Sequence, residues 1–170
     1  MPVNAHRLSS AAVIIGLIMG VGGCQQGSAS GPPPAASDND GVGTVTSIID
    51  GDTLRLDVDG NEVRVRLIGI DTPEVYPEVE CFGPEASAAL AELAPVGSQL
   101  TFAYDVDPRD RFDRELMYLF TLDDVFINAA LVEQGFATAV LFEPNDRHWN
   151  ELRALEQQAR DAGLGLWSAC

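Results

Sequence analysis

The sequence contains no lysine: all ten basic residues of the 170-residue chain are arginines. Against them stand 26 aspartates and glutamates, so the formal net charge is −16 at pH 7. Such an acidic chain is a poor candidate for a nucleic-acid binder that relies on a broad basic surface and counterion release. Any attraction for a polyanion must come from a local cluster of arginines.

Cysteine is scarce as well, and three cysteines are too few for a miniprotein built on disulfides. Hydrophobic residues make up 46% and charged residues 21%, which is typical of a globular protein and excludes a wholly disordered one. The sequence has no HExxH motif, paired CxxC motif, Walker loop or nucleophile elbow. The length fits one domain with an additional segment.

The N-terminal segment has the features of a targeting signal. Arg7 precedes an apolar stretch over residues 11–21, which is shorter than the roughly 20 residues that a membrane-spanning helix needs. The stretch ends at Val21 and is followed by two glycines and Cys24, an arrangement that resembles a bacterial lipobox. We expect residues 1–23 to be a lipoprotein signal peptide, and Cys24 to carry the lipid that anchors the exported protein to the cell envelope. The alternative is an ordinary secretory signal with an incidental cysteine.

A tether and one folded domain are expected after the signal. Residues 24–42 are rich in proline, glycine, serine and alanine and lack apolar periodicity, which is typical of a flexible tether. The folded domain is expected over residues 43–170, where 24 acidic residues and nine arginines leave a charge of 9 − 24 = −15. Because export favours disulfides and Cys24 is lipidated, we predict a bond between Cys81 and Cys170; the alternative is two free thiols.

Hydrophobic patterning predicts a mixture of strands and helices in this domain. Alternating or β-branched residues predict strands over 44–49, 53–58, 63–70, 99–106 and 116–122. Helices are predicted over 84–93, 126–134 and 145–162, the last capped by Asn145 or Asp146. His148 is interpreted as a surface or packing residue. Short strands combined with helices favour a small α+β domain built on a barrel.

Three short motifs carry the chemistry: Asp-Gly-Asp-Thr over residues 50–53, Arg66 followed by Asp-Thr-Pro-Glu over 71–74, and Asp-Arg-Phe-Asp-Arg over 110–114. In this order and spacing they resemble the staphylococcal nuclease (thermonuclease) family. Further matches are Phe-Gly-Pro-Glu-Ala over 82–86, Asn128 with Leu131, Val132, Gly135 and Ala137, and Gly-Leu-Trp-Ser over 165–168. The resemblance covers residues 43–170 and implies an α+β fold, an OB-fold five-stranded β-barrel with three helices.

Two aspartates in these motifs suit a metal ion. Asp52 and Asp71 offer hard carboxylate oxygens, the ligands that Ca²⁺ prefers, and Ca²⁺ usually completes its shell with backbone carbonyls and water. The resemblance implies that both side chains bind Ca²⁺ together with the backbone carbonyl of Thr72. Taken alone, Asp52 has a simpler interpretation as a turn residue.

The resemblance also implies the catalytic side chains. Glu74 corresponds to the general base, and Arg66 and Arg114 correspond to the two arginines that contact the phosphate. A guanidinium group matches two phosphate oxygens and stays charged while negative charge builds up in the transition state. Taken alone, Arg66 could lie on a solvated face of the barrel.

Three further residues are expected to contact the substrate. Arg111 and Phe112 stand where the family has a lysine and a tyrosine near a terminal phosphate, and Phe142 offers one surface for stacking on a base. The implied activity is calcium-dependent hydrolysis of DNA and RNA, with single strands preferred, by an exported monomer that leaves 3′-phosphates.

A second hypothesis is a binding module on the same fold that has lost turnover. It arises because Arg114 is flanked by Asp113 and Glu115, where the family commonly has small or neutral residues. These carboxylates could draw the guanidinium of Arg114 away from a phosphate. The two hypotheses therefore differ in whether Arg114 is available to the substrate.

Overall fold

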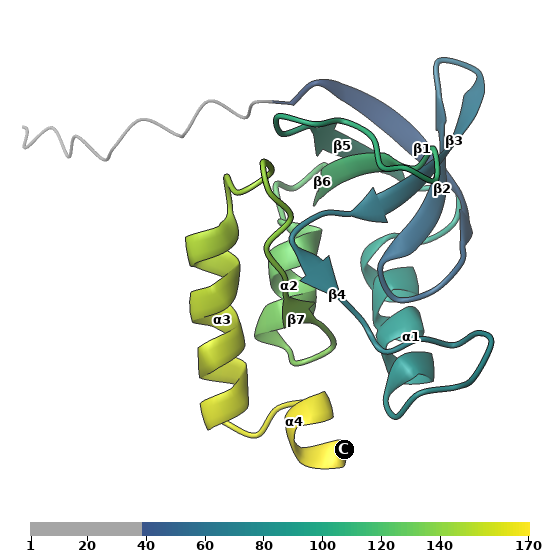
Figure 1. Ribbon diagram of the computed structural model, residues 1–170. Coiled ribbons are helices and arrows are strands. Elements are labelled where there is room, and N and C mark those ends of the chain that lie inside the picture. The colour runs from purple at the N-terminus through teal and green to yellow at the C-terminus, as the bar shows by residue number, and fades with distance from the viewer. Residues whose placement is uncertain (1–38) are drawn as a thin grey trace, which may run out of the picture. The chain divides into compact units, whose positions relative to one another are not determined.

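The computed structural model describes residues 39–170. The expected signal peptide, Cys24 and most of the expected tether lie outside the described residues. A closed five-stranded barrel dominates the described part, with strand order β1-β2-β3-β6-β5 (Figure 1). Its strands are β1 (Gly41–Ile48), β2 (Thr53–Val58), β3 (Asn61–Leu67), β5 (Gln99–Ala103) and β6 (Glu115–Thr121). The predicted OB-fold barrel with helices is thus confirmed.

Neighbouring strands of the barrel are antiparallel except β3 and β6, which run parallel. This parallel pair closes the barrel between segments that are far apart in the sequence. Its register places Arg66 of β3 opposite Leu116 of β6. Residues just before β6 therefore lie beside the middle of β3.

Helices cover one side and one end of the barrel, as Figure 1 shows. They are α1 (Gly83–Leu93), α2 (Ile127–Glu133), α3 (Trp149–Asp161) and the short α4 (Leu166–Ala169). α2 packs against both α1 and α3. A separate two-stranded sheet joins β4 (Ile70–Asp71) to β7 (Thr138–Ala139), and the sequence pattern predicted neither β7 nor α4. No helix in residues 39–170 is long and apolar enough to cross a membrane.

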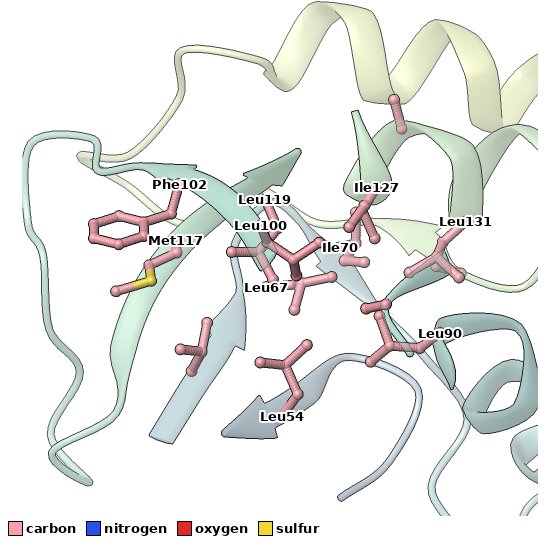
Figure 2. Close-up of a cluster of buried hydrophobic side chains, with 14 of the residues drawn as sticks. Leu54, Leu67, Ile70, Leu90, Leu100, Phe102, Met117, Leu119, Ile127 and Leu131 are labelled. Atoms are coloured by element: carbon pink, nitrogen blue, oxygen red, sulfur yellow. The ribbon is translucent and has the colours of Figure 1, made fainter. Parts of the chain in front are cut away.

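The hydrophobic core fills the barrel and continues to the helices. Leu54, Leu67, Leu100 and Leu119 point inward from four strands, and Figure 2 shows Leu131 of α2 beyond the end of the barrel. Leu54, Leu67 and Leu119 have no exposed surface at all. Burial of whole leucine side chains contributes about 1.5–3 kcal/mol each, so this core fixes the frame on which the polar residues stand.

Several predicted boundaries need correction. The predicted strand over 63–70 is interrupted by a turn at residues 68 and 69, where Gly69 has a positive φ, and the predicted strand over 99–106 ends at Ala103. β1 begins at Gly41, so the last two residues of the expected tether, residues 41 and 42, belong to the barrel. α3 begins at Trp149 and not at 145, and neither Asn145 nor Asp146 caps it. The reason is that Asn145 binds the backbone of Asp107: its Oδ1 accepts from the amide at 2.7 Å and its Nδ2 donates to the carbonyl at 2.9 Å.

The predicted disulfide between Cys81 and Cys170 is present, with a Cα–Cα distance of 5.9 Å. It joins the C-terminal end of the chain to the loop between β4 and α1. His148 packs edge-on against Tyr118, at 4.6 Å between ring centroids, which confirms its interpretation as a packing residue.

Candidate active site

Arg66 is the centre of the site. It lies in β3 and is only 7% exposed, so its interpretation as a solvated barrel residue is wrong. Its Nη1 donates to the carbonyls of Leu67 at 2.8 Å and Ile70 at 2.9 Å. These bonds turn the guanidinium inward, toward the bend between β3 and β4.

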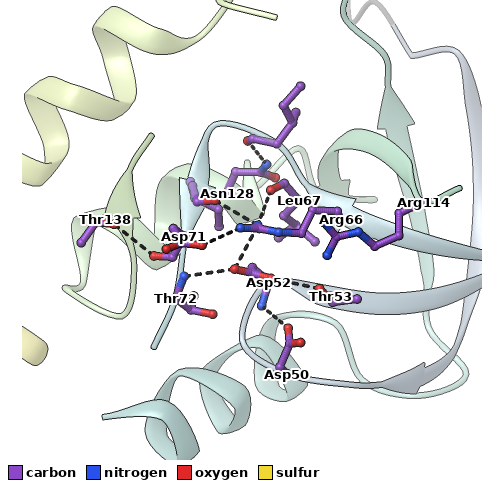
Figure 3. A network of polar contacts seen from close by, with 12 residues as sticks. Asp50, Asp52, Thr53, Arg66, Leu67, Asp71, Thr72, Arg114, Asn128 and Thr138 are labelled. Atoms are coloured by element: carbon purple, nitrogen blue, oxygen red, sulfur yellow. Dashed lines mark hydrogen bonds and ion pairs between the residues drawn. The ribbon is translucent and has the colours of Figure 1, made fainter. Parts of the chain in front are cut away.

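Both candidate metal ligands contact this guanidinium (Figure 3). Oδ2 of Asp52 lies 2.9 Å from Nη1 of Arg66, and Oδ1 of Asp71 lies 2.7 Å from Nη2. The Asp52 side chain is 8% exposed, whereas that of Asp71 is 56% exposed. The two carboxylates therefore share one cation, and one of them is open to solvent.

Asp52 does more than form a turn. Its Oδ2 accepts from the Thr72 amide at 3.0 Å and its Oδ1 accepts from Oγ1 of Thr53 at 3.0 Å. The first and second motifs are thus joined directly. The preceding residue, Gly51, has to be small because a Cβ there would lie 2.7 Å from Oγ1 of Thr72 and 2.9 Å from the Cβ of Ala86.

Negative charge exceeds positive charge in this cluster. Burial raises the pKa of Asp52 from 3.8 to about 7; Arg66 opposes this shift and the nearby charge of Asp50 adds to it. The pKa of Glu74 is also raised, first by partial burial and then by repulsion from Asp50 and Asp71. The cluster thus contains four carboxylates that repel one another and one guanidinium that offsets part of their charge. The carboxylates are those of Asp50, Asp52, Asp71 and Glu74.

This donor set fits a hard divalent cation. A bound cation offsets an excess of carboxylates such as this one, in which Asp52 and Glu74 have raised pKa values, and oxygen donors are those that Ca²⁺ selects. Within residues 39–170, no three acidic, histidine or cysteine side chains converge as a ready-made metal cage. Two aspartates would therefore need backbone carbonyl and water oxygens to complete a shell.

Arg114 lies just before β6, two residues from the partner of Arg66 in the β3–β6 register. Because side chains alternate along a strand, Arg66 and Arg114 project from the same face of the barrel. Figure 3 shows both side chains in one close-up. Nε of Arg114 is held by Oδ2 of Asp110 at 2.7 Å.

The acidic neighbours of Arg114 do not bind it. Asp113 and Glu115 both pair with Arg109 instead, the first at 2.9 Å from Nη1 and the second through Nη2. The expectation that these two carboxylates draw Arg114 away is therefore wrong. The partner of Arg114 is Asp110, which also accepts from the Arg114 amide at 2.9 Å.

Both arginines keep donors free of protein partners. Of the five N–H donors of a guanidinium, Arg66 uses two on Nη1 and one on Nη2, and Arg114 uses only the one on Nε. Within the described part of the chain, Nε and one Nη2 donor of Arg66 and both terminal nitrogens of Arg114 have no hydrogen-bond partner. Such donors are available to an oxyanion.

The candidate substrate-contacting residues fall into two groups. Phe142 lies under Arg66, at 5.9 Å from its Cζ to the ring centroid. Phe112 is 62% exposed and lies between Arg111, at 4.6 Å, and Arg114, at 5.6 Å. An aromatic ring thus adjoins each of the two candidate phosphate-binding arginines, and no contact in the described residues joins the two rings.

Residues that support the site were not all recognised from the sequence. Oδ1 of Asp50 accepts a hydrogen bond from the Asp52 amide at 3.0 Å. Its place in the first motif was the only sign of this role in the sequence. Asn128 is fully buried: its Oδ1 accepts from the Leu119 amide at 3.0 Å and its Nδ2 donates to the Ile68 carbonyl at 2.9 Å. It ties α2 to the turn after β3. Arg109 had no local pattern that identified its partners.

The chain is similar to known proteins over most of its length. Residues 64–169 match the family described as staphylococcal nuclease homologue. A thermonuclease of Staphylococcus intermedius is 35% identical over 126 residues, covering 72% of this chain and 74% of that protein. A thermonuclease of Staphylococcus hyicus is 32% identical over 145 residues, covering 82% and 85%.

A relative from outside Staphylococcus is also named a nuclease. The endonuclease YncB of Bacillus subtilis is 33% identical over 130 residues, which cover 74% of this chain and 61% of that protein. The family match spans more than half of the chain, and it includes Arg66, the second motif and Arg114. The chain belongs to the staphylococcal nuclease family, and its relatives support a nuclease.

Proposed function

We propose that the protein is a calcium-dependent nuclease that hydrolyses phosphodiester bonds of DNA and RNA and leaves 3′-phosphates. The observation that carries this proposal is the cluster in which Asp52 and Asp71 contact the guanidinium of Arg66 within an excess of carboxylates. Relatives named thermonuclease and endonuclease support the same class of reaction.

Asp52, Asp71 and the backbone carbonyl of Thr72 would hold Ca²⁺. When bound, the ion would polarise a phosphate oxygen and acidify a water molecule. The Asp52 carboxylate is kept in place by the Thr72 amide and the Thr53 hydroxyl. This fixed acceptor and the exposed Asp71 provide one rigid ligand and one that is accessible from solvent.

Glu74 is the proposed general base. Partial burial and the neighbouring charges of Asp50 and Asp71 raise its pKa, which makes its carboxylate a better proton acceptor. It takes the proton of the attacking water while the bond from phosphorus to the 5′-oxygen breaks. The water oxygen is then bonded to phosphorus, the leaving 5′-oxygen takes a proton from solvent water and becomes a hydroxyl, and the phosphate remains on the 3′-oxygen.

Arg66 and Arg114 are proposed to bind the non-bridging phosphate oxygens through their free N–H donors. Protein contacts hold both guanidinium groups in place, so little reorganisation accompanies phosphate binding. Their charge offsets the negative charge that develops as the phosphorus becomes pentacoordinate.

Exposed aromatic rings support a preference for single strands. Phe142 and Phe112 present ring faces beside the two arginines, and unpaired bases stack on such faces with little sequence preference. Arg111 adds a cation against Phe112. Bases within a duplex are already stacked on each other and would be less available.

We further propose that the protein works as an exported monomer, anchored to the envelope by a lipid on Cys24, with residues 1–23 as the signal peptide and a tether before the barrel. Support comes from the lipobox-like sequence and from the Cys81–Cys170 disulfide, because such bonds persist outside the cytoplasm. Mass spectrometry of the chain purified from membranes would test this: an unmodified Cys24 would contradict the anchor.

The activity is tested with the full-length chain in mild detergent, incubated with single-stranded DNA, duplex DNA and RNA in Ca²⁺ or in chelator. We expect cleavage only in Ca²⁺, products with 3′-phosphate ends, and large losses in Glu74→Gln and Arg114→Ala. Glu78→Gln, in the same loop, is the matched control. Calcium binding without cleavage would contradict the nuclease and favour the alternative, an inactive nucleic-acid-binding module.

A further inference from the structure

Arg109 holds together the two acidic residues that flank Arg114. Its Nη1 lies 2.9 Å from Oδ1 of Asp113, and its Nη2 contacts Oε1 of Glu115. The backbones of Arg109 and Glu115 also form an isolated antiparallel bridge. One guanidinium group therefore closes this loop and offsets two negative charges at once.

A separate set of contacts fixes Arg114. Asp110 accepts from its Nε at 2.7 Å and from its amide at 2.9 Å, and also from the amide of Phe112 at 2.9 Å. These bonds lower the pKa of Asp110 although partial burial acts in the opposite direction. The loop thus sorts its charges into two groups: Arg109 with Asp113 and Glu115, and Arg114 with Asp110.

The sorting matters because Glu115 is 8% exposed. A buried carboxylate that loses its cation is costly, and it takes another cation when one is within reach. Arg114 is adjacent in the chain and has four N–H donors without a partner among residues 39–170. Without Arg109, capture of Arg114 by Glu115 or Asp113 is the nearest way to restore charge pairing.

We propose that Arg109 is a positioning residue for Arg114: by binding Asp113 and Glu115, it keeps the terminal nitrogens of Arg114 available to the phosphate. This inference rests on the proposed nuclease activity. It explains how the chain combines a phosphate-binding arginine with two acidic neighbours. It also assigns a function to Arg109, a half-exposed arginine that directly precedes the third motif.

The test is a double-mutant cycle with single-stranded DNA in Ca²⁺, using Arg109→Gln in the wild-type and Arg114→Ala backgrounds. We expect Arg109→Gln to lower kcat by about 10- to 100-fold in the first background and by less than about twofold in the second, since it acts through Arg114. Equal losses in both backgrounds, or no loss in the first, would overturn the proposal.

Two variants sharpen the result. Adding Asp113→Asn and Glu115→Gln to Arg109→Gln removes the competing charges, so we expect most of the lost activity to return. Arg55→Gln is the matched control, because Arg55 forms an exposed pair with Glu62 at 2.7 Å that includes none of the proposed site residues, and we expect unchanged kcat. Failure of the neutralised variant to recover would contradict the charge-sorting explanation.

A crystal structure of the Arg109→Gln protein decides the inference without relying on activity. We expect the Arg114 guanidinium to leave Asp110 and pair with Glu115 or Asp113. An unchanged Arg114–Asp110 pair would overturn the inference even if the wild-type protein cleaves DNA. A wild-type protein without activity would contradict the proposed nuclease, while this structure would still answer the question about Arg109.

Discussion

Glu74 and Glu80 are joined by two hydrogen bonds that close the loop between them. The amide of Glu74 donates to Oε2 of Glu80 at 2.9 Å, and the amide of Glu80 donates to the Glu74 carbonyl at 2.8 Å. The next residue, Cys81, is fixed by the disulfide, and the amide of Gly83 donates to the Glu80 carbonyl at 3.1 Å. The proposed base therefore stands at the start of a closed loop and not on a free strand end.

The first prediction concerns this loop. Glu80→Ala removes the acceptor for the Glu74 amide, and one such bond is worth about 0.5–1.5 kcal/mol, so we expect kcat to fall by about 3- to 10-fold. Glu80→Gln keeps an acceptor oxygen and should retain most activity. Steady-state kinetics on single-stranded DNA would show this. Equal losses in both variants would mean that the charge of Glu80, and not its hydrogen bond, is what matters.

A second prediction concerns the disulfide. Removing it with Cys81→Ser and Cys170→Ser frees a loop of 89 positions, for which chain entropy gives a loss of about 4–5 kcal/mol in the free energy of unfolding. Urea denaturation of the oxidised, reduced and doubly substituted proteins would measure it. The reduced wild-type protein serves as the control and should match the double variant.

Calcium binding should depend on pH. The folded-state pKa of Asp52 is raised from 3.8 to about 7, so the folded protein binds more protons than the unfolded chain between these values. The metal-free protein then loses stability as pH rises from about 4 to about 7, while the ionised ligand becomes available. We expect Ca²⁺ to raise Tm more at about pH 8 than at about pH 5.

Differential scanning calorimetry with and without Ca²⁺ at both pH values is the measurement. Asp52→Asn is the control, because it removes the titrating group and should abolish most of the Ca²⁺-dependent rise in Tm at both pH values. A larger rise at the lower pH would contradict the role given to Asp52.

Asn128 should be important for stability. It is fully buried and satisfies the Leu119 amide and the Ile68 carbonyl, so Asn128→Ala leaves two buried groups unpaired at about 1–3 kcal/mol each. We expect the free energy of unfolding to fall by about 2–6 kcal/mol in urea denaturation. Asn61→Ala, at the exposed start of β3, is the control and should change it by less than about 0.5 kcal/mol.

Much of the barrel could be predicted because its strands alternate between core and surface. Residues 53–58 were predicted as a strand and form β2 with the same bounds. The start of α3 was missed because Asn145 pairs with Asp107, 38 positions away, and a local pattern carries no information about such a partner. Strand β7 has only two residues, too few for an alternation of apolar and polar residues to be recognised in the sequence.

The candidate site residues could be named before their arrangement was known. Asp52, Asp71 and Thr72 were named from the resemblance to the nuclease family, and the structure places them together beside Arg66. Burial of Arg66 could not be inferred from the alternation in β3, because the segments that cover it, β4 and the turn before it, follow later in the chain. The partners of Asp113 and Glu115 depended in the same way on how the loop closes.

The parallel pairing of β3 with β6 has a consequence for the order of folding. Every residue of the acidic cluster lies within residues 50–74, so these contacts span short stretches of chain and can form early. Arg114 joins them only when β6 pairs with β3, across some 50 intervening residues. A chain with only the first three strands paired would place Asp52 beside Arg66 but would lack the second guanidinium. Recovery of nuclease activity during refolding would therefore report barrel closure.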